Sequence, residues 1–164
     1  MILWIKPWNR WETNMEVLEL WEKFVTMHPE AKDSTYEVWA FGSNPSMADS
    51  LLALVLEGKK TWTCSAKKLF DYDDEPLPKE KEYSIILDGK SQPKAVIQTI
   101  TVDEIAFCDV PADFAYLEGE DDRSLAQWRY IHLNYFQEVF HTYGLTFTEK
   151  EILYCETFRV CYRA

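Results

Sequence analysis

Two short segments of the chain carry residues whose charges and spacing suit chemistry. Residues 59–68, KKTWTCSAKK, contain four lysines and no acid, and residues 118–124, EGEDDRS, begin with four acids in five positions. Lysines bind anions or stabilise developing negative charge, whereas clustered carboxylates move protons or bind a divalent cation weakly. The first segment therefore predicts an anion-facing patch or a solvated loop edge. The second predicts a functional turn, or simply acids that complement the dipole of a following helix.

Local patterns predict the elements that position the lysine segment. Apolar residues at helical spacing predict a helix over about residues 14–27, and aromatic alternation predicts a strand over 36–41. A capping box at Ser46 and the apolar run after it predict a second helix that stops at Gly58. The β-prone residues 61–64 follow this stop. The lysines are therefore expected to span the end of a helix and the start of a strand.

The acidic segment is predicted to lie between two helices. Pro111 opens a short helical piece, PADFAYLEG. From Leu125 onward, apolar and aromatic residues recur at helical spacing as far as Gly144, which predicts a long amphipathic helix. His132 lies on the apolar stripe of that helix. We therefore expect it to be a hydrogen-bonded core histidine rather than a ligand.

The order of the elements predicts the fold class. Residues 82–87 and 93–102 are β-rich runs joined by an Asp-Gly turn, which indicates an antiparallel hairpin, and residues 152–162 are β-rich again. Strands interleaved irregularly with helices predict an α+β fold with a mostly antiparallel sheet, and a small aromatic sheet is expected to close into a barrel that removes its edges. We expect residues 1–35 to form an N-terminal helical extension packed on a domain of residues 36–164.

The overall composition limits partners and compartment. The net charge is −11, and proteins bind nucleic acid largely by neutralising phosphates, so a long DNA duplex is not expected as a partner. We find neither a secretory leader nor the roughly 20 apolar residues of a membrane span. The four cysteines match neither a paired CxxC site nor a disulfide framework, and HxH and HExxH patterns are absent. We expect reduced thiols, a cytoplasmic protein, and no dedicated metal site or cofactor.

Four segments, taken in this order, resemble the ASCH family: GKKTWTCS (58–65), ILDGKSQPKAVIQT (86–99), EGEDDRSLAQWRYIH (118–132) and YCETFRV (154–160). The likeness spans roughly residues 38–162, and the GKKT, EGE and SLxxWR elements are its most specific parts. It implies a small β-barrel flanked by helices, similar to PUA domains, with a cleft between the GKKT segment and the acidic turn. It also implies RNA or a modified nucleoside as the partner.

The resemblance implies that the protein is a hydrolase, and it indicates which residues would be catalytic. Some short bacterial members look like amidohydrolases that remove the acetyl group of N4-acetylcytidine with a Lys, a Thr and a Glu. By motif, these catalytic residues correspond to Lys60, Thr63 and Glu120. Another branch resembles a ribonuclease, in which the equivalents of Lys60 and Ser124 are of interest. The residues expected to bind the substrate are Lys59, Ser65, Asp121, Arg123 and Ser124.

The chemistry of amide hydrolysis leaves the roles of these residues open. Thr63 would supply a hydroxyl, Lys60 a base or a cationic stabiliser, and Glu120 or its neighbour Asp121 an acid or an orienting partner. Burial lowers the pKa of a lysine and a carboxylate beside it raises the pKa, so Lys60 stays a cation if the acid prevails. Because side chains alternate along a strand, Lys60 and Thr63 can converge only if Lys60 belongs to the turn after Gly58.

Two other classes of function are open alternatives. A non-catalytic module would bind single-stranded RNA or a nucleotide-like ligand through the lysine segment, with base stacking on Trp39, Trp62 or Trp128. A protein-interaction domain in translation or transcription would suit the acidic composition. Only the joint occurrence of the lysine, threonine and acid elements favours the hydrolase over these readings.

Overall fold

One curved sheet organises the computed structural model, which describes residues 15–164. Its strands are hydrogen-bonded in the order β1-β3-β4-β5-β2; β1 pairs with β3 in parallel, and the other three pairings are antiparallel. The strands are β1 (Tyr36–Trp39), β2 (Trp62–Ala66), β3 (Tyr83–Leu87), β4 (Pro93–Ala106) and β5 (Ile152–Arg163). The helices are α1 (Met15–Met27), α2 (Pro45–Leu56), α3 (Lys67–Asp73), α4 (Ala112–Glu118) and α5 (Leu125–Thr142), with short 3-10 turns at Pro29–Ala31 and Phe107–Asp109.

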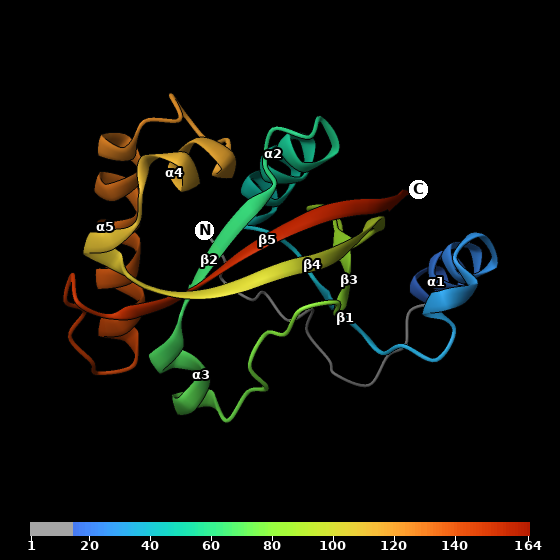
Figure 1. Cartoon of the computed structure of the whole chain (residues 1–164), viewed down its shortest axis with the longest axis horizontal. Coiled ribbons are helices and arrows are strands. Elements are labelled where there is room, and N and C mark those ends of the chain that lie inside the picture. Colours follow the sequence, from blue (N-terminus) through green and yellow to red (C-terminus); the bar gives the residue numbers. More distant parts are fainter. Residues whose placement is uncertain (1–14) are drawn as a thin grey trace.

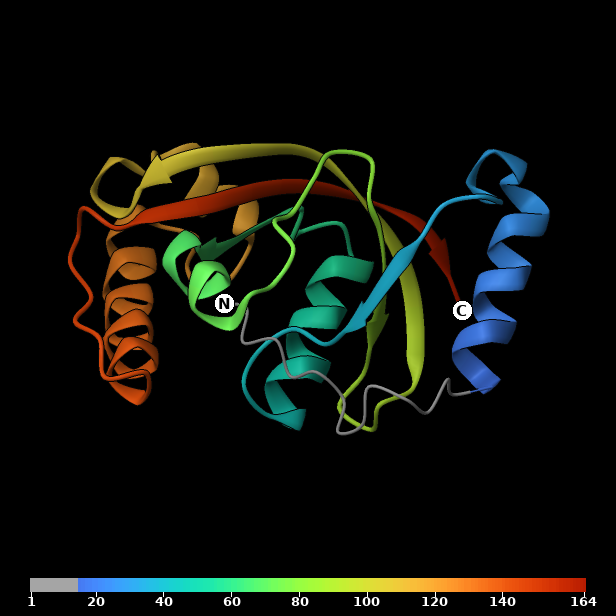
Figure 2. The same ribbon diagram turned by 90° about the horizontal axis from the view of Figure 1, so that it is seen from below.

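The sheet is open rather than closed into the predicted barrel. Strands β1 and β2 form its two edges, and in the described part of the chain they do not pair with each other. Two register shifts between β4 and β5, at Val96/Ile97 and Thr99/Thr101, bend these long strands, so that they arch over α2 (Figure 2). The α+β class is confirmed, with a mixed sheet. The barrel prediction is wrong because strand curvature and helices, rather than closure, cover the apolar surface.

The helices pack against different parts of the sheet. Figure 1 shows α1 at one end of the molecule and the α4–α5 pair at the other. Helix α1 buries its apolar stripe against the strand residues Tyr83, Ile85 and Val96, while α2 packs against the opposite face at Ile86 and Ile97. Helix α5 packs with β2 and the far end of β5. The helix predicted over residues 14–27 is confirmed over Met15–Met27, and residue 14 lies outside the described residues.

Two local predictions are corrected around α2 and β2. The N-cap of α2 is Asn44, whose side-chain oxygen accepts a hydrogen bond from Met47 N at 3.0 Å, and Pro45 begins the helix. Asp49, predicted to belong to a capping box with Ser46, instead accepts a hydrogen bond from Gly89 N at 2.8 Å. The last two lysines of the lysine segment begin α3, a helix that the sequence patterns did not predict.

The fold does not decide whether α1 belongs to a separate extension or to the domain itself, because α1 shares one apolar cluster with β3 and β4. The boundary at residue 35 therefore stays a prediction. Among residues 15–164, no helix combines the length and the apolar character that crossing a membrane requires.

Candidate functional site

The site begins in the turn that follows α2. The backbone N–H groups of Lys59 and Lys60 both donate to the carbonyl oxygen of Leu54, at 2.9 and 3.1 Å, so both residues belong to the turn that caps the end of α2. Strand β2 starts only at Trp62. Strand alternation therefore does not fix the direction of the Lys60 side chain. As expected from the sequence, Lys60 can converge with Thr63 only if it belongs to the turn after Gly58, and this condition is met.

The acidic turn lies directly on this lysine turn. Thr61 N donates to Leu117 O at 3.0 Å, which ties the last turn of α4 to the start of β2. Gly119 ends α4 with a φ of +76°, and a Cβ atom there would lie 2.3 Å from the carbonyl oxygen of Lys59. Glycine is therefore required both by the left-handed backbone and by the close approach of the two turns. This contact brings the neighbouring carboxylates toward Lys60.

A buried ionic cluster joins the two segments. The Lys60 ammonium is fully buried and donates to Glu118 Oε1 at 3.1 Å and to Glu120 Oε1 at 2.8 Å. Glu118 is also fully buried, whereas the Glu120 side chain keeps 15% of its surface exposed. The prediction that Lys60 meets an acid of this turn is confirmed, and the acid that contacts it is Glu120, joined by Glu118, rather than Asp121.

Electrostatics keep Lys60 positively charged. Burial alone would lower the pKa of Lys60, but the carboxylates of Glu118 and Glu120 raise it above its ordinary value. Burial likewise acts to raise the pKa of both acids, and the Lys60 charge overrides it, holding the pKa of Glu118 well below its usual range and that of Glu120 moderately below. Lys60 is therefore a cation in the folded protein, and Glu120 is the more accessible of the two carboxylates.

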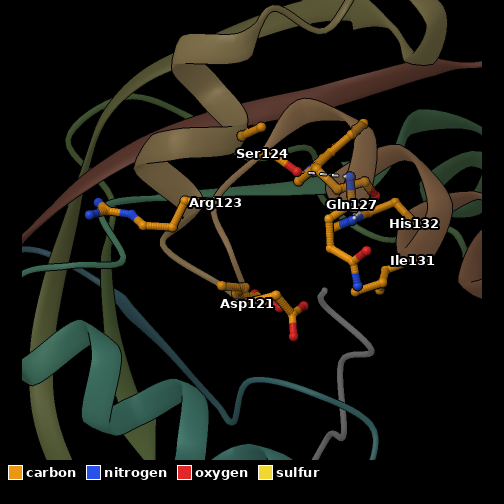
Figure 3. Close-up of a pocket in the computed structure, with 9 residues that line it drawn as sticks. Asp121, Arg123, Ser124, Gln127, Ile131 and His132 are labelled. Atoms are coloured by element: carbon orange, nitrogen blue, oxygen red, sulfur yellow. Dashed lines mark hydrogen bonds between the residues drawn. The ribbon is translucent and has the colours of Figure 1, made fainter.

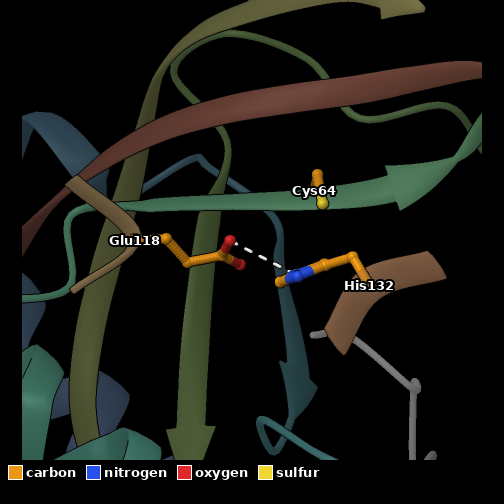
Figure 4. Close-up of side chains that lie close together, drawn as sticks. All are labelled: Cys64, Glu118 and His132. Atoms are coloured by element: carbon orange, nitrogen blue, oxygen red, sulfur yellow. Dashed lines mark ion pairs between the residues drawn. The ribbon is translucent and has the colours of Figure 1, made fainter. Parts of the chain in front are cut away.

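Glu118 is the centre of this cluster, and side chains of α5 hold its second oxygen. Trp128 Nε1 donates to Glu118 Oε2, and His132 Nε2 lies 3.3 Å from the same oxygen, a contact that does not meet the geometry of a hydrogen bond. His132 is buried, stacks on Trp128, and shares its Nδ1 with the Trp128 carbonyl at 2.9 Å. Figure 4 shows Glu118 and His132 pointing toward each other below Cys64.

The same three side chains form the one cluster of described residues whose donor atoms could hold a metal ion. The ligand atoms of Cys64, Glu118 and His132 lie within 4.8 Å of one another. A cation would meet the Lys60 ammonium on the same carboxylate, and burial raises the pKa of the Cys64 thiol well above normal, which disfavours the thiolate that metals bind. The donor set therefore suits an ion-paired core better than a metal centre.

A pocket opens beside Glu120, lined by residues of the acidic turn and α5. Asp121 is exposed at its rim, and Figure 3 shows Gln127, Ile131 and His132 gathered on one side. Ser124 lines it too, but its hydroxyl oxygen accepts a hydrogen bond from Gln127 N at 3.2 Å as the N-cap of α5. The predicted substrate residues Asp121 and Ser124 thus lie together at a pocket.

Arg123 contacts both α4 and the lysine turn. Its guanidinium stacks on the Tyr116 ring at 3.7 Å, and Nε donates to the Tyr116 carbonyl at 3.0 Å. Figure 3 shows its side chain extending away from Gln127, Ile131 and His132. One terminal nitrogen reaches the Lys59 carbonyl at 3.5 Å. Arg123 therefore links α4 to the lysine turn, and it is also one of the residues that line the pocket.

The anion-facing patch predicted from the lysine segment is neutralised in the structure. Each lysine is paired with a carboxylate, so little positive charge is left to hold a phosphate chain. Lys59, predicted to bind substrate, is exposed and lies 2.7 Å from Glu57. Lys67 pairs with Glu104 at 2.8 Å and Lys68 with Glu151 at 3.5 Å, in addition to the buried Lys60 pairs.

Thr63 and Ser65 do not join the ionic cluster through hydrogen bonds. Both are buried in β2, and neither hydroxyl has a hydrogen-bond partner among the described residues. Because side chains alternate, these two residues face away from the side of β2 that carries Trp62 and Cys64. The structure thus brings Lys60 and Glu120 together, and leaves Thr63 as a buried hydroxyl close by in the chain.

Sequence reasoning missed Glu118 as the central acid. It interpreted Glu118 as an N-terminal acid of the following helix, whereas Glu118 is the last residue of α4. An acid at a helix C-terminus opposes the helix dipole, and this unfavourable position was the available signal that a cation lies nearby. His132 and Trp128 are core residues, as expected, but they also hold Glu118 in place.

Two solved structures are similar to this chain over most of its length. The crystal structure of an ASCH domain from Lactobacillus crispatus JV V101 is similar with a TM-score of 0.86 and 24% identity, over 98% of this chain and all of that one. A crystal structure of a protein from Enterococcus faecalis V583 is similar with a TM-score of 0.82 and 36% identity, over 89% of this chain and 88% of that chain. No curated protein matches the chain. The ASCH domain model matches residues 37–162, and the chain therefore belongs to the ASCH domain family.

Proposed function

We propose that the protein hydrolyses the acyl–nitrogen bond of a modified nucleoside such as N4-acetylcytidine. One observation carries the proposal: a fully buried Lys60 cation is held against Glu120, which borders a pocket and stays partly exposed. Two of the three ammonium N–H donors engage Glu118 and Glu120, and the third has no acceptor among the described residues. A preorganised, unused donor on a buried cation suits the stabilisation of an oxyanion.

The roles follow from charge and access. Lys60 stabilises the negative charge that develops on the acyl oxygen. Glu120 accepts the proton of the attacking hydroxyl and passes it to the leaving nitrogen as the C–N bond breaks. Thr63, whose buried hydroxyl has no hydrogen-bond partner among residues 15–164, is the proposed nucleophile, and water would then release the acyl group from it. Glu118 acts through Lys60, because it fixes the ammonium and is itself fixed by Trp128.

The lysine pairing makes long RNA a less suitable substrate than a nucleoside. A protein that holds a phosphate backbone needs uncompensated Lys and Arg, whereas here all four lysines of residues 59–68 are paired within a chain of net charge −11. A nucleoside carries no phosphate and avoids this repulsion. Binding of RNA without turnover is the alternative outcome of the experiment below.

The test measures conversion of N4-acetylcytidine to cytidine by the full chain. We expect turnover by the wild type, a loss of kcat of at least about 100-fold in Glu120→Gln and in Thr63→Val, and partial activity in Thr63→Ser, which keeps the hydroxyl. Glu104→Gln, which changes an exposed carboxylate paired with Lys67, is the matched control and should leave turnover unchanged. Absence of turnover in the wild type on this and related acylated nucleosides, or full activity of Glu120→Gln, would refute the proposal.

A further inference from the structure

Strand β2 and its neighbour β5 share a row of polar side chains that the ionic cluster does not use. The hydroxyls of Thr63 and Ser65 lie on one face of β2, are at least nine-tenths buried, and have no hydrogen-bond partner among the described residues. A buried hydroxyl without a partner costs free energy that a purely structural residue such as Val or Ala would avoid. Two of them on one face point to a ligand that supplies the partners.

A third polar group lies on the same face. Glu156 on β5 is directly opposite Thr63 in the antiparallel register, so the two side chains point the same way. Thr99 Oγ1 donates to Glu156 Oε2 at 3.1 Å, and Glu156 forms no ion pair with a lysine or arginine of the described residues. The charged groups that act on it are the acids Glu82 and Glu37, both from the neighbouring β3–β1 side of the sheet.

Glu156 is consequently a carboxyl group that holds a proton near neutrality. Its pKa is raised to about 7: burial raises the pKa most, Glu82 and Glu37 also raise it, and the Thr99 hydrogen bond lowers it. The protonated form has one donor and one acceptor on the same planar group. Below about pH 7 this face of the sheet therefore offers hydroxyls and an uncharged carboxyl group, in contrast to the fixed charges around Lys60.

This face adjoins the Lys60 site. The Lys60 ammonium lies 5.5 Å from the centroid of the Phe41 ring, and Phe41 packs against Phe158 with ring centroids 5.9 Å apart. Phe158 is two residues beyond Glu156 on β5, and its backbone N–H donates to Thr61 O at 2.9 Å, beside Lys60. These ring contacts and the hydrogen bond from Phe158 N to Thr61 O connect the Lys60 site to the face of the sheet that carries Glu156.

We propose that this face, with Thr63, Ser65 and Glu156, binds the uncharged planar ring of the substrate, and that Glu156 contacts the ring's hydrogen-bonding edge as a neutral carboxylic acid. The proposal takes its ligand class, a pyrimidine nucleoside, from the proposed function. The Glu156 O–H donates to a ring nitrogen or carbonyl, and its C=O accepts from a ring or exocyclic N–H. Phosphate is not the ligand, because the carboxylates of Glu37 and Glu82 repel an anion.

The experiment is calorimetric binding of cytidine to the full-length protein at pH 6 and pH 8. We expect wild-type affinity to fall several-fold from pH 6 to pH 8, because Glu156 loses its O–H donor on ionisation. Glu156→Gln keeps one donor and one acceptor without titrating, so its affinity should be the same at both pH values. Glu156→Ala should bind about tenfold more weakly than the wild type at pH 6. Glu104→Gln should behave as the wild type.

The outcomes separate this proposal from the proposed hydrolysis. Wild-type affinity for cytidine in Glu156→Ala, or a pH dependence that survives in Glu156→Gln, would overturn the role of Glu156. Turnover of N4-acetylcytidine that is insensitive to both Glu156 changes would overturn it as well, and would leave the hydrolase proposal standing. Cytidine binding that depends on Glu156 in a protein without turnover would refute the hydrolase and retain the binding face. Thermal unfolding of each variant shows that the protein measured is folded.

Discussion

Strand β2 borders two polar regions that differ in how their hydrogen-bonding capacity is met. Around Lys60, one cation and two carboxylates neutralise one another, and Trp128 and His132 hold the remaining oxygen of Glu118. Around Glu156, within the part of the chain that the structure describes, the carboxyl group has one hydrogen bond from Thr99, and the hydroxyls of Thr63 and Ser65 have none. The first region is stable without a ligand, while the second gives up stability that a ligand would restore.

This difference suggests that the buried charges and the neutral polar groups contribute differently to stability and to binding. A fully buried charge must be paired to exist in the folded state, so the Lys60 cluster is as much a structural joint between α2, α4 and β2 as a chemical group. A neutral hydroxyl or carboxyl can stay unpaired at a modest cost. Variants of the first region should therefore affect stability strongly, and variants of the second should affect binding more than stability.

The largest expected effect is that of Lys60→Met. Removing the ammonium leaves the carboxylates of Glu118 and Glu120 buried without their cation, and the free energy of unfolding should fall by about 3–5 kcal/mol. Lys67→Met, which removes an exposed lysine paired with Glu104, is the matched control and should cost less than about 1 kcal/mol. Urea unfolding of both variants measures the difference. Equal losses would mean that the buried cluster carries no special share of the stability.

The second expected effect concerns the contact that aligns the two turns. Gly119→Ala places a Cβ atom 2.3 Å from the Lys59 carbonyl oxygen at a φ of +76°, so the free energy of unfolding should fall by about 2–3 kcal/mol, with loss of turnover. Gly144→Ala has a similar φ of +67° and open space around its Cβ atom, and should cost only about 1 kcal/mol. If both variants lose the same stability, the close approach of α4 to Lys59 is not a constraint.

The third prediction uses pH to separate the two regions. The folded pKa of Glu156, about 7, lies above that of an unfolded glutamate, so the native state holds an extra proton between these values. This carboxyl group therefore contributes stability that is present in acid and is lost as the pH rises to about 7. Glu156→Gln should be more stable than the wild type at pH 8 by about 1–2 kcal/mol, and nearly equal to it at pH 4.5.

Chemical unfolding of the wild type and Glu156→Gln across this pH range is the measurement. A difference between the two proteins that stays constant with pH would show that Glu156 does not titrate in this range. The carboxylates of Glu118 and Glu120 have lowered pKa values, so they act with the opposite sign, and their contribution is lost as the pH falls below the usual range of a glutamate. Because both proteins share them, they cancel in the comparison.

The smallest expected effect is a gain. Thr63→Val replaces an unpaired buried hydroxyl by a methyl group of similar shape, and should leave stability unchanged or raise it by up to about 1 kcal/mol. In Thr101→Val, the lost hydroxyl is one that shares a hydrogen bond of 2.7 Å with Thr157, so that variant should lose about 1 kcal/mol. Thermal unfolding measures both changes. A clear loss of stability in Thr63→Val would mean that its hydroxyl has a structural partner.

Sequence reasoning predicted the elements near Lys60 well, because their signals are local. The Gly58 stop after an apolar run and the helical stripe from Leu125 depend on neighbours within a few residues. It placed the N-cap of α2 two residues late and did not predict α3, where Lys67 and Lys68 begin a helix without a side-chain cap. Barrel closure was predicted wrongly, because bulges in β4 and β5 and the packing of α2 are not local properties.

For the candidate site, the sequence identified the two segments and their pairing but not the full set of contacts. Lys60 and Glu120 were predicted together and contact each other, while Glu118 was missed. Lys59 and Arg123 were predicted as substrate residues, and the structure gives them an exposed ion pair with Glu57 and a stacking contact on Tyr116. Glu156 was not singled out at all, because a single acid in a β-rich run carries no pattern.

The sequence by itself determined the family, the helices and strands around the lysine turn, and the presence of a cation and acids able to meet, since these depend on residue type and short-range spacing. Tertiary structure alone decided that Lys60 is a buried cation, that Glu118 and Glu120 both hold it, and that Glu156 faces Thr63. The physical reason is that burial and strand register set the pKa and the partner of each group, and both arise from contacts between residues far apart in the chain.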